Sequence, residues 1–389
     1  MRVALIGNMN NNHFAMMRYF HDLGVEAHLF KFANEFDHFQ PECDTFNIEK
    51  WKPYIHQTNI IDGDFIQLIK LSKKYLYKTF YGYDFYIGNG MSPVYLYKAR
   101  IRLDLFLPYG LGIEYTYRPL KNNFWDAIKE KIVQIVQELA IKKNVSIVCS
   151  SEEVTIKKSL SLGKRTEKLS IPMVYFEKNE SQEWPINETI KNRILDADFK
   201  LFSHVSHVDH TGMIYKIKRN DILIDAFSKY ILNNPNDNSI LILLSYGNDT
   251  TYTKKLIYES GLESKVVWLP LMTRKDLMFI ISKIDMGASE FGGYTWGGTG
   301  WEFLCSGKLF FHYINMKNSE IEETLGATIP PFINSNDADF IAEKIAYYYQ
   351  NRFELKRSEQ ILKDWYNCNA GIDLAAKYLN LLQNQQKPV

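Results

Sequence analysis

The chain has 389 residues, enough for two or three domains of about 150 residues each. Hydrophobic residues make up 46% and charged residues 23% of it, which excludes a disordered, collagen-like or coiled-coil protein. Lysine and arginine together number 46 against 45 aspartates and glutamates, so the formal charge is +1. A dedicated nucleic-acid binder would need a basic excess that this chain lacks.

The sequence predicts a cytoplasmic protein. No apolar stretch approaches the roughly eighteen residues that a membrane span needs, and the apolar start at 3–6 runs into Gly7 and polar asparagines instead of a signal-peptide pattern. The four cysteines lie far apart and form no CxxC pair, so we expect reduced thiols and no disulfide or zinc framework. They are Cys43, Cys149, Cys305 and Cys368.

Strands and helices are expected to alternate in the first half. Short apolar runs predict strands at 3–6, 85–87, 103–107 and 145–149. Helical spacing predicts helices at 14–23, which Gly24 ends, and at 124–141. This alternation favours a parallel sheet with helices on its faces.

The stretch 177–192 predicts an interdomain linker, because it is polar, contains Pro185 and has no apolar period. We therefore expect an N-terminal Rossmann-like domain at 1–176 and a C-terminal Rossmann-like domain at 193–370. Residues 371–389 are expected to form a helix that packs back on the N-terminal domain.

The same alternation restarts after the linker. Strands are expected near Leu201 and at 239–244, 266–269, 286–288 and 309–313. Helices are expected at 221–232, 252–260, 275–281, from Trp301, and at 337–350 and 374–382. The fold class is thus α/β, with two doubly wound domains that face a central cleft, where such sheets bind ligands.

A glycine-rich loop at 289–300 leads directly into the helix expected at Trp301. Its backbone N–H groups and the positive helix end could hold a phosphate. Glu302, in the first turn of that helix, could accept hydrogen bonds from vicinal hydroxyls such as those of a ribose. The glycines are Gly292, Gly293, Gly297, Gly298 and Gly300.

A second candidate anion site lies before the helix expected at 221–232. Lys216, Lys218 and Arg219 precede that helix, so their charges would add to its dipole on one anion. An isolated basic pair is more often a solvated loop. Two anion-binding helix starts in one domain make that alternative less attractive.

These segments resemble the retaining GT-B glycosyltransferases of family 4. Residues 218–227 resemble the family's Lys-Gly-x-Asp-x-Leu-x-x-Ala-Phe stretch, with Lys218 at the phosphate-binding lysine and Arg219 in place of the glycine. Residues 295–297 with Glu302 resemble its Gly-aromatic-Gly and ribose-binding glutamate. The family's first glutamate falls on Tyr294, and the nearest acid is Glu290.

Weaker matches extend the resemblance over most of the chain. Residues 7–13 look like the amino-terminal acceptor and diphosphate loop, and 107–114 resemble the loop after the fourth strand. Gly247 matches the glycine at the start of the donor cleft, and 266–272 the segment that reads the nucleobase.

The resemblance implies transfer of a sugar, with retention, from a nucleoside-diphosphate sugar to a glycan or lipid-linked acceptor, as in surface polysaccharide or lipopolysaccharide synthesis. It implies no metal and no cofactor. The catalytic residues it implies are Lys218, Arg219 and His13. The donor-binding residues are Glu302, Glu290, Gly297, Gly298, Thr299, Gly247 and Leu271. The acceptor side is Asn10, Asn11, Asn12, Tyr109 and Gly110.

Two alternative functions stay open. A sugar-nucleotide 2-epimerase shares this fold. It would change the donor sugar without passing it on, so free nucleoside diphosphate released in the presence of an acceptor would argue against it. A catalytically silent partner that binds a nucleotide sugar is suggested by Tyr294 at the family's first-glutamate position.

Three histidines, His204, His207 and His210, invite a zinc hypothesis. They fall at a strand end, where a three-residue spacing does not put all three on one face, so we expect no metal there. A contact of one of them with the donor diphosphate is the stronger hypothesis.

A basic amphipathic stripe lies on the helix expected at 124–141. Its apolar members are Phe124, Ile128, Ile132, Ile135, Val136 and Leu139, and nearby lysines are Lys121, Lys129, Lys131, Lys142 and Lys143. Such a stripe more often packs on its own sheet. It can also lie on anionic lipid, which would place the protein peripherally on the inner face of the cell membrane. A second cluster, Lys70, Lys73, Lys74 and Lys78, lies in the same half.

Overall fold

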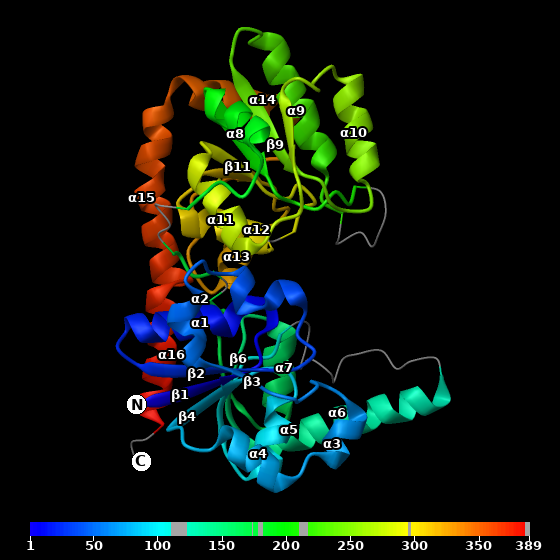
Figure 1. Ribbon diagram of the computed structural model, residues 1–389, viewed down its shortest axis with the longest axis vertical. Coiled ribbons are helices and arrows are strands. Elements are labelled where there is room, and N and C mark those ends of the chain that lie inside the picture. The colour runs from blue at the N-terminus through cyan, green and yellow to red at the C-terminus, as the bar shows by residue number, and fades with distance from the viewer. Residues whose placement is uncertain (110–122, 173, 178–181, 210–216, 295–296, 386–389) are drawn as a thin grey trace. The chain divides into compact units, whose positions relative to one another are not determined.

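The computed structural model describes residues 1–109, 123–172, 174–177, 182–209, 217–294 and 297–385. The chain divides into two compact units, drawn in Figure 1. Unit 1 comprises Met1–Tyr175, Glu323–Ala327 and Cys368–Val389. Unit 2 comprises Phe176–Glu322 and Thr328–Asn367. The expected N-terminal domain was 1–176 with a C-terminal helix at 371–389. Unit 1 also includes 323–327, and its last segment begins at Cys368.

Unit 1 contains a seven-stranded parallel sheet in the order β3-β2-β1-β4-β5-β6-β7. Its strands are β1 (Arg2–Ile6), β2 (Glu26–Lys31), β3 (Ile55–Gln57), β4 (Phe85–Gly88), β5 (Leu103–Phe106), β6 (Val145–Cys149) and β7 (Arg165–Glu167). Its helices include α1 (Asn12–Asp22), α2 (Ile48–Trp51), α3 (Phe65–Lys70), α4 (Lys73–Phe80), α5 (Ser92–Ala99), α6 (Phe124–Asn144), α7 (Glu153–Ser161) and α16 (Ile372–Asn384).

Both faces of this sheet are buried, which explains the unbroken apolar run of β1. Alternate residues of a strand point to opposite faces. Val3 and Leu5 pack in one core with α1 and α16, while Ala4 and Ile6 pack in the other with α4 and α5. The Tyr378 hydroxyl of α16 donates to the Ser170 carbonyl at 2.6 Å, so the C-terminal helix is an integral part of unit 1.

Unit 2 contains a six-stranded parallel sheet in the order β10-β9-β8-β11-β12-β13. Its strands are β8 (Phe199–Ser203), β9 (Ser239–Leu244), β10 (Val266–Leu269), β11 (Met286–Ala288), β12 (Phe310–His312) and β13 (Ile333–Asn334). The helices that follow α7 are α8 (Glu188–Asp196), α9 (Asn220–Asn233), α10 (Thr250–Glu259), α11 (Arg274–Lys283), α12 (Gly298–Ser306), α13 (Asn318–Leu325), α14 (Ala338–Gln350) and α15 (Arg352–Asn369).

Most element predictions are confirmed, and four of the described strands, β6, β9, β10 and β11, have the expected bounds. Two of the differences concern where helices begin. The expected linker is partly helical, because the Asn187 side chain accepts a hydrogen bond from Ile190 N and caps α8 inside it. The helix expected from Trp301 begins three residues earlier, at Gly298.

Most of the apolar stripe of α6 does not pack on the core of unit 1. Val136 is partly buried against that core, and the helix buries mainly a different face, formed by Val133, Gln137, Ala140 and Ile141 among others. The other five members of the stripe are exposed: Phe124 70%, Ile128 37%, Ile132 40%, Ile135 54% and Leu139 48%. Trp125, at 68%, extends it. Among the described residues, none of the helices is both long and apolar enough to span a bilayer.

Candidate functional site

The predicted donor residues gather where the strand order of unit 2 reverses. From β8 the chain runs outward through β9 and β10, then returns to add β11 on the other side of β8. The loops after β8 and β11 therefore diverge at the carboxyl edge of the sheet, and such a switch point is where open α/β sheets bind ligands. His204 follows β8, and Ser289 and Glu290 follow β11.

Lys218 and Glu290 form an ion pair at this edge. Lys218 Nζ lies 2.6 Å from Glu290 Oε2, and their side chains are 22% and 14% exposed. The backbone fixes the pair, because Phe291 N donates to the Lys218 carbonyl at 2.9 Å and Lys218 N donates to the Val208 carbonyl at 2.7 Å. The structure thus brings together two residues that lie 72 positions apart in the sequence.

Glycine is required for this close approach. A Cβ on Gly292 would lie 2.2 Å from the Ile217 carbonyl oxygen, so no other residue fits beside the backbone that carries Lys218. A Cβ on Gly297, the residue before α12, would lie 3.5 Å from Glu290 Oε1. The carboxylate of Glu290 thus lies near the amino end of α12, which favours anions.

The amino end of α12 carries two further predicted residues. Thr299 Oγ1 lies 2.8 Å from Ser289 Oγ, which ties the first turn of the helix to the loop after β11. A Cβ on Gly298 would come no nearer than 3.9 Å to Glu302 Oε1, so this position has room.

Glu302 is buried, with both carboxylate oxygens engaged. Its Oε2 lies 2.7 Å from His204 Nε2, and its Oε1 accepts from Arg274 Nε at 2.9 Å. Burial alone would raise the pKa of Glu302, but the hydrogen bond from His204 and the charge of Arg274 outweigh it and lower this pKa. Glu302 is therefore an anion that a histidine and an arginine hold in place.

Of the two described histidines, His204 and His207, it is His204 that reaches a predicted donor residue. Its Nδ1 is buried and has no hydrogen-bond partner. His207 has a structural role, because its Nε2 lies 2.8 Å from the Leu244 carbonyl and its Nδ1 3.0 Å from Thr253 Oγ1. His210 lies outside the described residues, as does Lys216. Within the described ranges, no group of three or more His, Cys, Asp or Glu side chains could hold a metal ion.

His312 was missed by the sequence analysis and supports the loop after β11. Burial is the largest cause that lowers its pKa, to about 4, so the ring is neutral at pH 7. Its Nδ1 accepts from Glu290 N at 3.2 Å, and its Nε2 lies 2.8 Å from the Tyr294 carbonyl. Both ring nitrogens thus hold the loop that presents Glu290. Tyr294 itself is 45% exposed.

Arg219 occupies a backbone position that favours glycine. Its φ is 57°, in the left-handed region, where any residue other than glycine is disfavoured. Its guanidinium pairs with Asp221 at 2.9 Å and stays 48% exposed. Arg219 is therefore close to Lys218 in sequence, but its charge is already partnered within the first turn of α9.

The two other predicted donor residues differ in burial. Gly247 has φ 112°, and a Cβ there would lie 2.4 Å from both the N and the O of His207. Gly247 thus shapes the loop after β9 and leaves no room for a side chain. Leu271, after β10, is 68% exposed.

The described acceptor-side residues lie in unit 1: Asn10 and Asn11 between β1 and α1, Asn12 at the first residue of α1, and Tyr109 after β5. Asn10 and Asn11 have φ of 54° and 59°, so two consecutive asparagines are left-handed. Asn10 Nδ2 contacts the Tyr109 hydroxyl. Asn12 is buried, and neither atom of its amide has a partner. Gly110 lies outside the described residues.

His13, the third predicted catalytic residue, is buried at the start of α1. Its Nδ1 lies 2.7 Å from the Gly7 carbonyl, and its Nε2 has no hydrogen-bond partner. Burial is the largest cause that lowers its pKa, to about 4, so His13 is neutral at pH 7.

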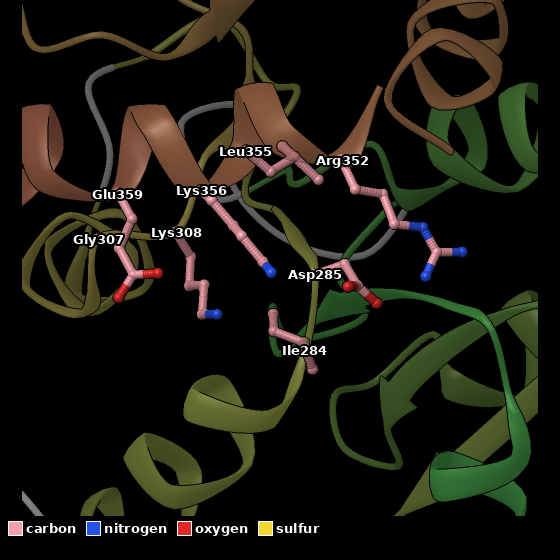
Figure 2. A pocket seen from close by; sticks show the side chains of 8 residues that line it. All are labelled: Ile284, Asp285, Gly307, Lys308, Arg352, Leu355, Lys356 and Glu359. Carbon is pink, nitrogen blue, oxygen red and sulfur yellow. The ribbon is translucent and has the colours of Figure 1, made fainter. Parts of the chain in front are cut away.

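A cavity of about 290 Å³ lies at the opposite edge of the unit 2 sheet. Figure 2 shows Lys308, Lys356 and Arg352 around it together with Asp285 and Glu359. Asp285 directly precedes β11, so the cavity faces the amino ends of the strands. It is thus separate from the Lys218–Glu290 pair, and its mixed charge selects neither an anion nor a cation.

No family model matches the sequence, and no curated protein matches it. Solved structures match nearly the whole chain, and they define a GT-B fold with two Rossmann-like units. The predicted fold class is thereby confirmed.

Three of these structures illustrate the likeness. HepE of Anabaena, solved with UDP, is 13% identical with a TM-score of 0.59, covering 99% of this chain and 100% of that one. Sucrose-phosphate synthase of Thermosynechococcus elongatus is 15% identical at TM-score 0.54, with coverages of 99% and 98%. A protein assigned as a UDP-N-acetylglucosamine 2-epimerase of Listeria monocytogenes is 11% identical at TM-score 0.56, with coverages of 99% and 96%. At these identities the likeness establishes the fold.

Proposed function

We propose that this chain is a glycosyltransferase that binds a nucleoside-diphosphate sugar in unit 2 and transfers the sugar, with retention, to a glycan or lipid-linked acceptor of surface polysaccharide or lipopolysaccharide synthesis. The single observation that carries the proposal is the meeting of Lys218, Glu290 and the amino end of α12 at the switch point of the sheet. HepE, of the same fold, was solved with UDP, with UDP-glucose, and with UDP and glucose, which makes UDP the first nucleotide to test.

The donor diphosphate would replace Glu290 as the partner of Lys218. A diphosphate at the amino end of α12 needs a positive charge beside it. Lys218 can supply this charge, because its Nζ pairs with Glu290, whose carboxylate lies near that helix end. The departing diphosphate gains charge during transfer, and a fixed cation stabilises it without the need for a metal ion. The released Glu290 carboxylate would then accept hydrogen bonds from donor sugar hydroxyls.

Glu302 would bind the ribose. Its two oxygens are held by His204 and Arg274, and a carboxylate oxygen can accept a second hydrogen bond through its other lone pair. The pair of partners keeps Glu302 ionised, which suits an acceptor of two vicinal hydroxyls.

Glu302→Gln is expected to weaken binding of the nucleoside diphosphate by about 5- to 150-fold, equivalent to about 1–3 kcal/mol. Glutamine keeps the volume, so the packing of α12 survives, whereas alanine would leave a cavity at a buried position and remove the acceptor of the Arg274 and His204 contacts. The measurement is a thermal-shift series with UDP, GDP, CDP, ADP and NAD, since a ligand of the folded state raises the melting temperature. Glu259→Gln, an exposed acid on α10, is the matched control.

An unchanged nucleotide shift in Glu302→Gln would refute the ribose assignment. The absence of a shift with every nucleotide, in a wild-type protein that melts cooperatively, would refute the donor site. The 2-epimerase alternative is separated by products: transfer releases the nucleoside diphosphate when an acceptor is added, whereas epimerisation leaves it bound in the sugar nucleotide.

We also propose that unit 1 binds an anionic membrane surface through α6. At about 100° per residue, the six exposed apolar side chains from Phe124 to Leu139 fall within about a 100° arc of the helix. Exposed lysines border it, Lys129, Lys131, Lys142 and Lys143. An apolar face with flanking lysines fits the boundary between acyl chains and anionic headgroups. Such a position would suit a lipid-linked acceptor.

Ile128→Asp combined with Ile135→Asp is expected to lower binding to vesicles that contain phosphatidylglycerol by at least about tenfold, because two charges enter the apolar arc. Co-sedimentation at low salt measures it. Leu232→Asp, at an apolar residue of α9 that is 74% exposed, is the control. Failure of the wild-type protein to sediment with these vesicles, or equal sedimentation of the double variant, would remove the membrane proposal.

A further inference from the structure

A cavity of about 210 Å³ opens in unit 1 at the carboxyl edge of its sheet. The strand order reverses between β1 and β4, so this edge is the switch point of unit 1. The residues that line the cavity follow the ends of β1, β2, β3 and β4. They are Asn8, Met9, Phe32, Asn34, Glu35, Phe36, Phe39, Asp62 and Asn89.

Glu35 is a half-satisfied buried carboxyl group in this cavity. Its Oε1 accepts from Asn8 N at 2.6 Å and from Phe32 N at 3.1 Å. Its Oε2 is buried and has no hydrogen-bond partner. A buried polar atom without a partner is costly, so an oxygen of this kind at a cavity wall points to a ligand that hydrogen-bonds. Burial is the largest cause that raises the pKa of Glu35, to about 7.

The polar wall is held rigidly. Asp62 Oδ1 accepts from Met91 N at 2.9 Å. The side-chain amide of Asn34 accepts from Asp62 N at 2.7 Å and donates to the Asp62 carbonyl at 3.1 Å. Asn8 Nδ2 donates to Asn11 Oδ1 at 2.7 Å, and Asn8 Oδ1 accepts from Phe14 N at 3.0 Å. The left-handed asparagines of the loop thus serve to fix Asn8 at the cavity.

The cavity also has aromatic lining residues. Phe36 and Phe39 meet edge to face, with ring centroids 5.6 Å apart, and Phe36 is 65% exposed. Flat apolar rings together with carboxylate and amide oxygens match the two kinds of surface of a sugar ring, one with C–H groups and one with hydroxyls. The volume equals that of about seven waters at about 30 Å³ each, so it suits one ring and is small for a drug-sized ligand.

The charge of the cavity selects against an anion. Of the described residues that line it, two are acids and none is lysine, arginine or histidine. A phosphate or a uronic acid would meet the carboxyl groups of Glu35 and Asp62, and the described residues of the wall include no cationic side chain.

We propose that this cavity binds an uncharged sugar ring of the acceptor, with Glu35 and Asp62 as hydroxyl partners and Phe36 as the ring platform. This assignment rests on the proposed function, because only a sugar-transfer reaction makes the bound sugar an acceptor. It locates recognition in residues next to the asparagine loop.

Saturation-transfer NMR with methyl glycosides of neutral hexoses at about 10 mM, enough to fill a site of about 1 mM Kd, tests the proposal. Glucosamine, glucuronate and a hexose phosphate are the charged probes. At least one neutral glycoside is expected to bind wild-type protein, and Glu35→Gln and Phe36→Ala should each weaken it by about tenfold or more. Asp37→Asn, an exposed neighbour of Phe36, is the control that should not change it.

Three results would overturn the proposal: no binding of any neutral glycoside, stronger binding of a charged probe, or binding that both variants leave unchanged. Phe36→Ala covers the case in which Glu35→Gln does not fold, because an exposed side chain can be removed without a cavity. Nucleotide binding in unit 2 is a separate readout. If the nucleotides fail and the glycoside binds, the proposed function falls and the sugar site stands. If sugar transfer occurs and the Glu35 and Phe36 variants leave it unaffected, the proposed function stands and the sugar site falls.

Discussion

Lys218→Ala is expected to lower the rate of sugar transfer by about 10²- to 10³-fold, because it removes a cation that the structure places beside the proposed diphosphate site through Glu290. The loss should fall mainly on kcat, since charge on the departing diphosphate grows only in the transition state. Stability should change by about 1 kcal/mol, because both partners of the ion pair retain contact with water. Steady-state release of the nucleoside diphosphate measures the effect.

Two companion variants give this experiment its controls. Lys218→Arg keeps a positive charge and should retain more activity than alanine, although a planar guanidinium does not reproduce the geometry of an ammonium. Lys255→Ala removes a lysine of α10 that is 68% exposed and should leave the rate unchanged. Activity of Lys218→Ala within about threefold of wild type would remove Lys218 from the mechanism.

Gly247→Ala is expected to destabilise unit 2 by about 3–5 kcal/mol, the sum of an unfavourable backbone conformation and overpacking. The residue has φ 112°, and the added Cβ would lie 2.4 Å from two backbone atoms of His207. Backbone cannot move aside as a flexible side chain can. The melting temperature should fall by roughly 10 °C, as measured by calorimetry.

Gly261→Ala separates the two causes. Gly261 also has a positive φ, 67°, but nothing lies within 4 Å of its added Cβ, so only the conformational cost of about 1 kcal/mol applies. Equal losses for the two variants would show that the contact with His207 does not matter.

Local sequence patterns predicted five of the six described strands of unit 2, because each of these five is a short, mainly apolar run. The two-residue strand β13 was missed. Ser239–Leu244 is buried at all six positions, as a central parallel strand must be. α15 was missed, because of its 18 residues only three widely spaced ones, Leu355, Leu362 and Tyr366, are buried. A stripe that narrow does not stand out from a polar segment.

The partners within the site could not be predicted from the sequence. Arg274 and His204 reach Glu302 across 28 and 98 positions, and their contact depends on how β8, α11 and α12 pack. The exposure of the α6 stripe was equally hidden, since hydrophobic spacing defines a face without showing what covers it. The sequence did indicate two parts of the candidate site: the glycine loop that leads into a helix at 297–302, and Lys218, which precedes α9.

The most direct test of the nucleotide-sugar site is the crystal structure of the protein with UDP bound. The account predicts the diphosphate within hydrogen-bond distance of Lys218 Nζ and the backbone N–H groups at the amino end of α12, the ribose at Glu302, and the Glu290 carboxylate turned away from Lys218. UDP bound elsewhere, with the Lys218–Glu290 pair intact, would contradict it.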